Sequence, residues 1–230
     1  TERNMALAID AAERRCGTSV DERFIWKSMR NKDLSRSFRH FVWLAMHEGY
    51  FIGKKWKHTN KPEREICEEC DMQELMEHIL LKCKSNGREA IWKMAKKLWE
   101  RATNSPLVVS WGDILTCGLR STSNDDDAES KGDDRLRRIL ISESAHLIWK
   151  IRNNRTINGK RASIAEVKNR WIYAIINRRR IEFLTSDMSR YGRKALRGAT
   201  VRYTWRNTSL SGLSIELDRT SLTEVLGSIT

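Results

Sequence analysis

The stretch CEECDMQELMEHILLKC, Cys67–Cys83, holds three of the five cysteines of this 230-residue chain and one of its five histidines. Its spacing is Cys67-x2-Cys70-x7-His78-x4-Cys83. Two cysteines separated by two residues turn their sulfurs toward one point, and His78 and Cys83, roughly one helical turn apart, close the far side. Four nitrogen and sulfur ligands suit tetrahedral zinc and leave no open position for a substrate. The sequence therefore predicts one structural Zn²⁺.

Two alternatives accompany this ligand set. The four residues could cluster by chance as small core residues, or His58, which precedes them, could replace a ligand. Cys16 and Cys117 lie far from the cluster, and an odd count of cysteines is not typical of a secreted disulfide framework. We expect two buried thiols there, with a Cys16–Cys117 bridge as the alternative. A reducing compartment places the chain inside the cell, in the nucleus or the cytoplasm.

Apolar residues recur at helical spacing along most of the chain, notably over Leu34–Met46, Ile91–Ala102, Leu136–Ile151 and Ile164–Ile181. No run of eighteen apolar residues occurs, so no membrane span is predicted. The predicted fold class is mainly α: a helical domain with an embedded Cys3His zinc motif, plus a basic helical-hairpin unit.

The composition divides the chain into four parts. Residues 1–120 form a helical unit that contains the zinc motif (67–83), and the polar stretch 121–134, STSNDDDAESKGDD, reads as an acidic linker. Residues 135–206 form a basic helical unit, in which two helices joined at Asn158-Gly159 pack as an antiparallel hairpin. The Ser/Thr-rich residues 207–230 are expected to form a flexible tail.

The positive charge is concentrated in the basic unit. Nineteen Lys/Arg and four Asp/Glu lie between Arg135 and Arg206, a net charge of +15 against +13 for the whole chain. A localised cationic field is typical of a phosphate-rich partner, so we expect nucleic acid, RNA or DNA, and neither a membrane nor a small-molecule substrate. The predicted contacts are Arg152, Arg155, Lys160, Arg161, Lys168, Arg170, Arg178, Arg179, Arg180 and Trp205. The alternative is a solvated basic face that only keeps the chain soluble.

The chain is not expected to be an enzyme by itself. Its only acidic cluster, Asp125–Asp127 with Glu129, Asp133 and Asp134, lies in Ser/Asn/Gly-rich sequence without flanking strands. Such a segment is typical of a solvated loop, whereas polymerase and nuclease sites need acids that converge from strands.

The zinc motif and the GREAIWKMAKKLW that follows resemble the zinc-binding segment of reverse transcriptase/RNase H polyproteins from non-LTR retrotransposons, in particular those of basidiomycete fungi. IWKSMRNKDLSRSFRHFVWLAMHEGYFIGKKW is similar to the stretch ahead of that segment. RLRRILISESAHLIWKIRNNR, EVKNRWIYAIINRR and YGRKALRGATVRYTW are similar to its basic helices. The resemblance implies the metal ligands Cys67, Cys70, His78 and Cys83, and a role in gripping element RNA or target DNA. A rival interpretation is a zinc-scaffolded protein-interaction module recruited from a retroelement.

Overall fold

The structure is a computed structural model that describes residues 1–85, 87–120 and 127–208. Its α-helices are α1 Glu2–Cys16, α2 Glu22–Ser28, α3 Arg36–Met46, α4 Arg88–Thr103, α5 Trp111–Leu115, α6 Ala128–Asn158, α7 Ile164–Thr185, α8 Met188–Tyr191 and α9 Gly198–Thr204. Short helical turns are η1 Gly53–Trp56, η2 Pro62–Glu65, η3 His78–Lys82 and η4 Gly192–Lys194. β1 Ile66–Cys67 pairs antiparallel with β2 Met72–Gln73. The predicted class, mainly α with an embedded Cys3His cluster, is confirmed.

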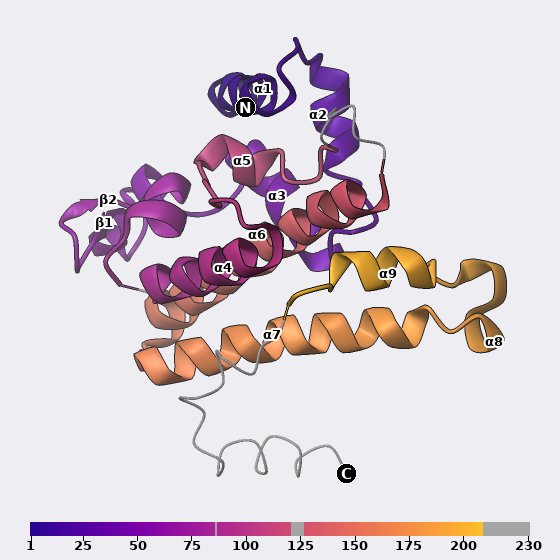
Figure 1. Ribbon diagram of the computed structural model, residues 1–230. Helices are drawn as coiled ribbons and strands as arrows, with labels where there is room; N and C mark the ends of the chain where they lie inside the picture. The colour runs from indigo at the N-terminus through magenta and orange to yellow at the C-terminus, as the bar shows by residue number, and fades with distance from the viewer. Residues whose placement is uncertain (86, 121–126, 209–230) are drawn as a thin grey trace.

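The long helix α6 runs through the middle of the molecule (Figure 1). α4 packs against it, while α1, α2, α3 and α5 lie above it in this view and α7 and α9 below. The β1–β2 hairpin projects to the left. Among the described helices, none combines the length and the apolar composition that crossing a membrane requires.

The hairpin of α6 and α7 is bounded by local capping interactions. The carboxylate of Asp127 accepts from the backbone N–H of Ser130 at 2.6 Å and starts α6. Gly159, with φ 67°, ends α6 in the left-handed conformation that glycine adopts without steric cost. Ser163 then accepts from the N–H of Glu166 and starts α7. The turn between the helices lies where the sequence predicts it.

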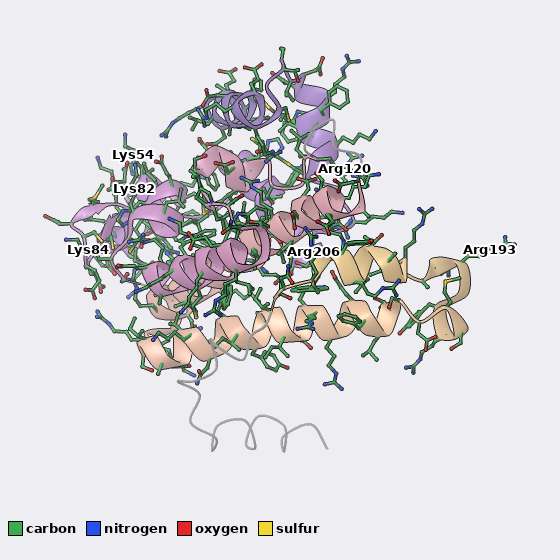
Figure 2. All side chains as sticks on the ribbon, in the orientation of Figure 1. Lys54, Lys82, Lys84, Arg120, Arg193 and Arg206 are labelled. Atoms are coloured by element: carbon green, nitrogen blue, oxygen red, sulfur yellow. The ribbon has the colours of Figure 1, made fainter. Side chains whose placement is uncertain are left out.

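The first turns of α6 are held against α9 by close backbone packing. A Cβ on Gly132 would lie 2.7 Å from the carbonyl carbon of Tyr203, so only glycine allows this approach. Arg206, which follows α9 (Figure 2), pairs with Asp133 at 2.9 Å. The expected linker over 121–134 is therefore corrected, because residues 128–134 belong to α6. Residues 121–126 lie outside the described residues, as do residues 209–230, most of the expected tail.

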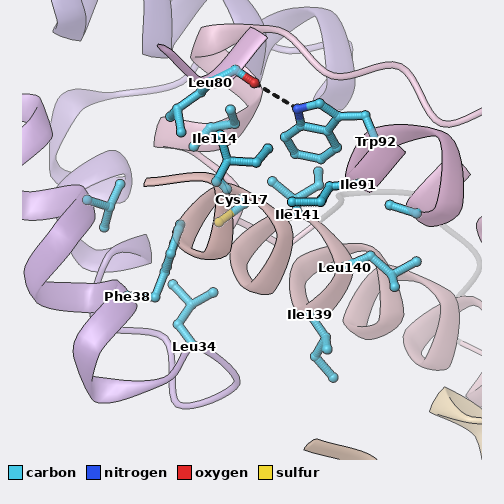
Figure 3. Packing of buried hydrophobic residues seen from close by; sticks show 14 of the residues in the cluster. Leu34, Phe38, Leu80, Ile91, Trp92, Ile114, Cys117, Ile139, Leu140 and Ile141 are labelled. Atoms are coloured by element: carbon cyan, nitrogen blue, oxygen red, sulfur yellow. Dashed lines mark hydrogen bonds between the residues drawn. The ribbon is translucent and has the colours of Figure 1, made fainter. Parts of the chain in front are cut away.

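One hydrophobic core joins the two expected units. It extends from Met5 in α1 to Trp205 after α9. Ile91 of α4 and Leu140 of α6 belong to the same cluster (Figure 3). α6 packs against α4, α7 and α9 at once, so it buries apolar residues on more than one side. The division into two helical units is therefore corrected to one body built around α6.

A buried ionic cluster reinforces this core. Arg135 on α6 donates to Asp33 at 2.8 Å and to both carboxylate oxygens of Glu182 on α7, at 2.7 and 2.8 Å. The indole N–H of Trp205 donates to Glu182 at 2.7 Å. We call Asp33, Arg135, Glu182 and Trp205 the Arg135 cluster. It ties the segment before α3 to α6, α7 and the end of α9, since a buried charge must keep its partners.

Candidate metal centre and basic surface

The β1–β2 hairpin carries the first two cysteines. Cys67 pairs with Met72 across the ladder, and the carbonyl of Cys67 accepts from the N–H of Cys70 at 3.3 Å and of Asp71 at 2.9 Å. Asp71 has φ 52°, a left-handed conformation that aspartate tolerates better than most residues. This tight turn places the sulfurs of Cys67 and Cys70 on the same side.

A π-helical turn, η3, carries the other two ligands. The N–H of Cys83 donates to the carbonyl of His78 at 2.7 Å, an i→i+5 hydrogen bond. In a regular α-helix, side chains five residues apart diverge by about 140°. The wider π turn brings them together, and such turns are frequent at functional sites. Trp92 of α4 holds the turn by donating to the carbonyl of Leu80 at 2.8 Å (Figure 3).

The ligand atoms of Cys67, Cys70, His78 and Cys83 all lie within 4.8 Å of one another. The Cys83 sulfur is 3.7 Å from that of Cys67 and 3.9 Å from that of Cys70. A tetrahedral Zn²⁺ with Zn–S bonds of about 2.3 Å would hold its sulfurs about 3.8 Å apart. Both ring nitrogens of His78 are buried without a hydrogen-bond partner among the described residues, and a metal bond would satisfy one of them. The four residues therefore fit one metal ion.

The surroundings of the cluster also suit a cation. Burial lowers the pKa of His78, which favours the neutral imidazole that binds metals. Burial raises the pKa of Cys83 to about 11 in the metal-free protein, so its thiolate needs a compensating charge. The backbone N–H of Lys84 donates to the Cys70 sulfur at 3.2 Å, a contact that stabilises a thiolate. The alternative ligand His58 is exposed and lies outside the cluster.

Of the two cysteines outside the cluster, Cys117 is buried as the sequence predicts, whereas Cys16 is only half-buried. No disulfide joins Cys16 to Cys117. Burial raises the pKa of the Cys117 thiol to about 12, so that thiol stays protonated at neutral pH. The alternative of a Cys16–Cys117 bridge is wrong.

The metal motif is fastened to α6 by a buried ion pair. Glu74, just after β2, accepts from Nε of Arg152 at 3.0 Å and from Arg155 at 3.3 Å. Arg155 also donates to Ser85, whose hydroxyl lies 3.0 Å from the Cys83 sulfur. Arg152 is only 1 % exposed. The predicted role of Arg152 in nucleic-acid binding is wrong, because its guanidinium is buried and neutralised inside the protein. Arg155 pairs with the same carboxylate, that of Glu74.

Two more predicted contact residues also face inward. Arg178 donates to Glu182 at 2.8 Å and to the carbonyl of Asp33 at 2.6 Å. Trp205 is 4 % exposed and belongs to the Arg135 cluster. The predicted base-stacking role of Trp205 is wrong, because its buried ring offers no open face to a base. The carboxylate of Glu182 accepts from both Trp205 and Arg178.

The other predicted residues lie at the surface, but several already have acidic partners. Arg161 pairs at 2.5 Å with Glu69, which lies in the turn of the β1–β2 hairpin; we call this hairpin the metal hairpin. Arg170 pairs with Glu166 at 2.5 Å. Lys160 and Arg180 are exposed, and Lys168 and Arg179 are half-buried. The predicted set is therefore not one continuous cationic surface.

A different set of cations is exposed and forms no ion pair in the part of the chain that the structure describes. Five cations are exposed on α8, on η4, just before α9 and on α9, and none forms an ion pair within the described residues: Arg190, Arg193, Lys194, Arg197 and Arg202. Arg190 interacts electrostatically with Asp187, at the start of its own helix. We call these five residues the α8–α9 edge. Arg193 projects from its outer end (Figure 2). The sequence held a signal for this set, because residues 188–203 contain no acidic residue.

Comparisons with models of protein families, with curated proteins and with solved structures find no match to this chain.

Proposed function

We propose that the chain is a non-catalytic nucleic-acid-binding module whose fold is held by one structural Zn²⁺. The observation that carries the proposal is the α8–α9 edge, where five exposed cations stand together and form no ion pair in the described residues. Phosphates that bind there release condensed counterions and relieve the mutual repulsion of the cations. RNA and DNA both supply such phosphates.

Two exposed tyrosines strengthen the proposal. Tyr191 is 39 % exposed and Tyr203 is 37 % exposed, and both lie among the cations of the α8–α9 edge. Aromatic rings beside cations stack on bases while the cations hold the backbone. A surface that only kept the chain soluble would have no need of exposed rings.

The metal has a structural role in this proposal. Three sulfurs and one imidazole complete a tetrahedral zinc shell and leave no position for a reacting water. The spacing of the sulfurs, 3.7 and 3.9 Å, supports zinc as the ion. The resemblance to non-LTR retrotransposon polyproteins suggests a retroelement origin and element RNA or target DNA as the partner.

The test compares two triple variants that remove the same charge. Arg193→Gln, Lys194→Gln and Arg197→Gln alter the α8–α9 edge, whereas Lys93→Gln, Lys96→Gln and Lys97→Gln alter exposed positions of α4. Labelled RNA and DNA are titrated at several salt concentrations. Each lost phosphate contact lowers the log–log salt slope by about 0.7 to 0.9, so the edge variant should lose about 2 to 3. An equal decrease of the salt slope in both variants would show a general effect of charge and would contradict the proposed interface.

A second candidate function, the binding of a protein partner, is supported by the outer face of α7. The outer face of α7 exposes large apolar side chains: Tyr173 by 49 %, Ile176 by 41 %, Phe183 by 42 % and Leu184 by 49 %. Such a stripe suits a protein partner. Binding through it would change little with salt, so Ile176→Asp should abolish a salt-insensitive interaction and leave nucleic-acid binding intact.

A further inference from the structure

A pocket of about 490 Å³ lies between α2 and α3, and its lining includes no residue of the metal motif or of the α8–α9 edge. Its size falls within the range of small-ligand sites. Two indoles, three guanidinium groups and an imidazole line it: Trp26, Trp43, Arg30, Arg36, Arg39 and His40. No acidic side chain is among the residues that line it.

The two indoles are fixed in position by a third ring. His47 stacks on Trp26 with ring centroids 5.1 Å apart and planes 17° apart, and lies 4.6 Å from the ring of Trp43. Trp43 remains 50 % exposed although its helix contributes several residues to the core. A large aromatic surface is thus held open beside the pocket.

The arginines of the pocket lack counterions in the described residues. Neither Arg30, Arg36 nor Arg39 forms an ion pair there, and Nε of Arg39 is buried without a hydrogen-bond partner. A buried donor left unsatisfied costs free energy unless a ligand or water accepts from it. Three guanidinium groups gathered without an acid predict an anionic ligand, and guanidinium suits phosphate in particular.

We propose that this pocket, the α2–α3 pocket, holds one nucleotide of a single-stranded nucleic acid. The base stacks on Trp43, and Arg36 and Arg39 bind the adjacent phosphate. The proposal rests on the proposed nucleic-acid function but assigns a separate site to it. An acidic peptide would satisfy the arginines and leave the indoles unused, whereas a nucleotide uses both. A base inside a duplex has no free face for Trp43, so single strands are the ligand.

The test uses two single-stranded oligonucleotides of equal length, one normal and one abasic, which carry the same phosphates. Trp43→Ala should weaken binding of the normal strand about 5- to 150-fold, the effect typical of one lost base stack. Binding of the abasic strand should stay unchanged. The matched control is Phe24→Ala, which removes a 56 % exposed ring of α2 outside the pocket. It should affect neither strand.

An arginine variant tests the phosphate contact. Arg36→Gln changes an exposed residue, so the protein should keep its helicity and its metal content. It should weaken binding of the normal and the abasic strand alike and lower the salt slope by about 0.7. Lys93→Gln, an equal loss of charge on α4, serves as its control.

The outcomes separate this proposal from the proposed function. If the parent binds single strands and Trp43→Ala binds both oligonucleotides as the parent does, the pocket proposal falls and the α8–α9 edge stands. If the parent binds no nucleic acid, both proposals fall. Binding of a phosphopeptide that depends on Trp43, without binding of either oligonucleotide, would overturn the ligand assignment.

Discussion

Glu74 and Arg152 form a buried ion pair that joins the metal motif to the central helix. Nε of Arg152 donates to the carboxylate of Glu74 at 3.0 Å, and the two residues are 1 % and 2 % exposed. Neither charge reaches solvent, so each depends on the other. The position of the metal hairpin is therefore coupled to α6, which begins well beyond it in the sequence.

Arg152→Ala should lower the free energy of unfolding by about 3 to 5 kcal/mol, because it leaves the carboxylate of Glu74 buried without its main partner. Urea unfolding measures the change. Arg161→Ala, which breaks the exposed pair with Glu69, should cost under about 1 kcal/mol. A double variant, Glu74→Leu with Arg152→Leu, should recover much of the loss. Equal costs for the two single variants would contradict the buried role of this pair.

Removal of the metal should loosen the whole protein, because the metal motif and α6 share one core. A structural zinc contributes about 10 kcal/mol or more in small domains, so a chelator should melt the chain in one cooperative step. Circular dichroism and tryptophan fluorescence should report the same midpoint. Survival of the helices after residue 127 would show instead that the two halves fold independently.

The metal content should be one zinc per chain, with a clear dependence on the ligand set. Cys67→Ser and Cys83→Ser should each lose the ion, as measured by elemental analysis, since each removes one thiolate of four ligands. Cys16→Ser is the matched control, because Cys16 lies outside the cluster, and it should retain the ion.

Trp205→Phe should destabilise the protein without weakening nucleic-acid binding. The change keeps an aromatic ring but removes the N–H that donates to Glu182 at 2.7 Å. A lost hydrogen bond to a buried carboxylate costs about 1.5 to 3 kcal/mol. Thermal unfolding checks the loss, and a salt titration with labelled RNA should give the parent slope. A salt slope lower than that of the parent would show that Trp205 takes part in nucleic-acid binding.

The stability should fall as the pH drops below about 6.5, the ordinary pKa of histidine. Burial lowers the pKa of His146 to about 4, and the nearby Lys150 acts in the same direction. Between these values the unfolded state binds a proton that the folded state does not, so the free energy of unfolding decreases. The ring of His146 packs against that of Phe41, with ring centroids 5.7 Å apart. His146→Leu should therefore flatten the dependence of stability on pH between these two values. An unchanged profile would exclude His146 as the cause.

Local patterns predicted the helices and the metal cluster, because both depend on short-range spacing. The heptad-like stripes of α3 and α4 and the cysteine spacing of the metal motif need only neighbours in the sequence. The division into units failed for the opposite reason. An acidic, polar stretch shows where a loop lies, but it does not show whether the helices on either side share a core.

The basic residues show the same limit. Arg135 and Arg152 lie in a cationic region of the sequence, yet the carboxylates of Asp33 and Glu74, which pair with them, lie in the first half of the chain. Counting charges within one segment misses neutralisation from another. The sequence also did not reveal that the ring of Trp43 is half-exposed, because a tryptophan on an amphipathic helix usually faces the core.

The Arg135 cluster also sets an order in which the protein can form during synthesis. Arg135 donates to Asp33, 102 positions earlier, and Glu182, 47 positions later, must be synthesised before Arg135 has its full set of partners. The metal ligands, by contrast, lie within seventeen residues of one another. On the ribosome the metal hairpin can close while α6 and α7 are still absent. The part of the core that α7 and Trp205 contribute must wait for the last third of the chain, so long-range contacts complete the core last.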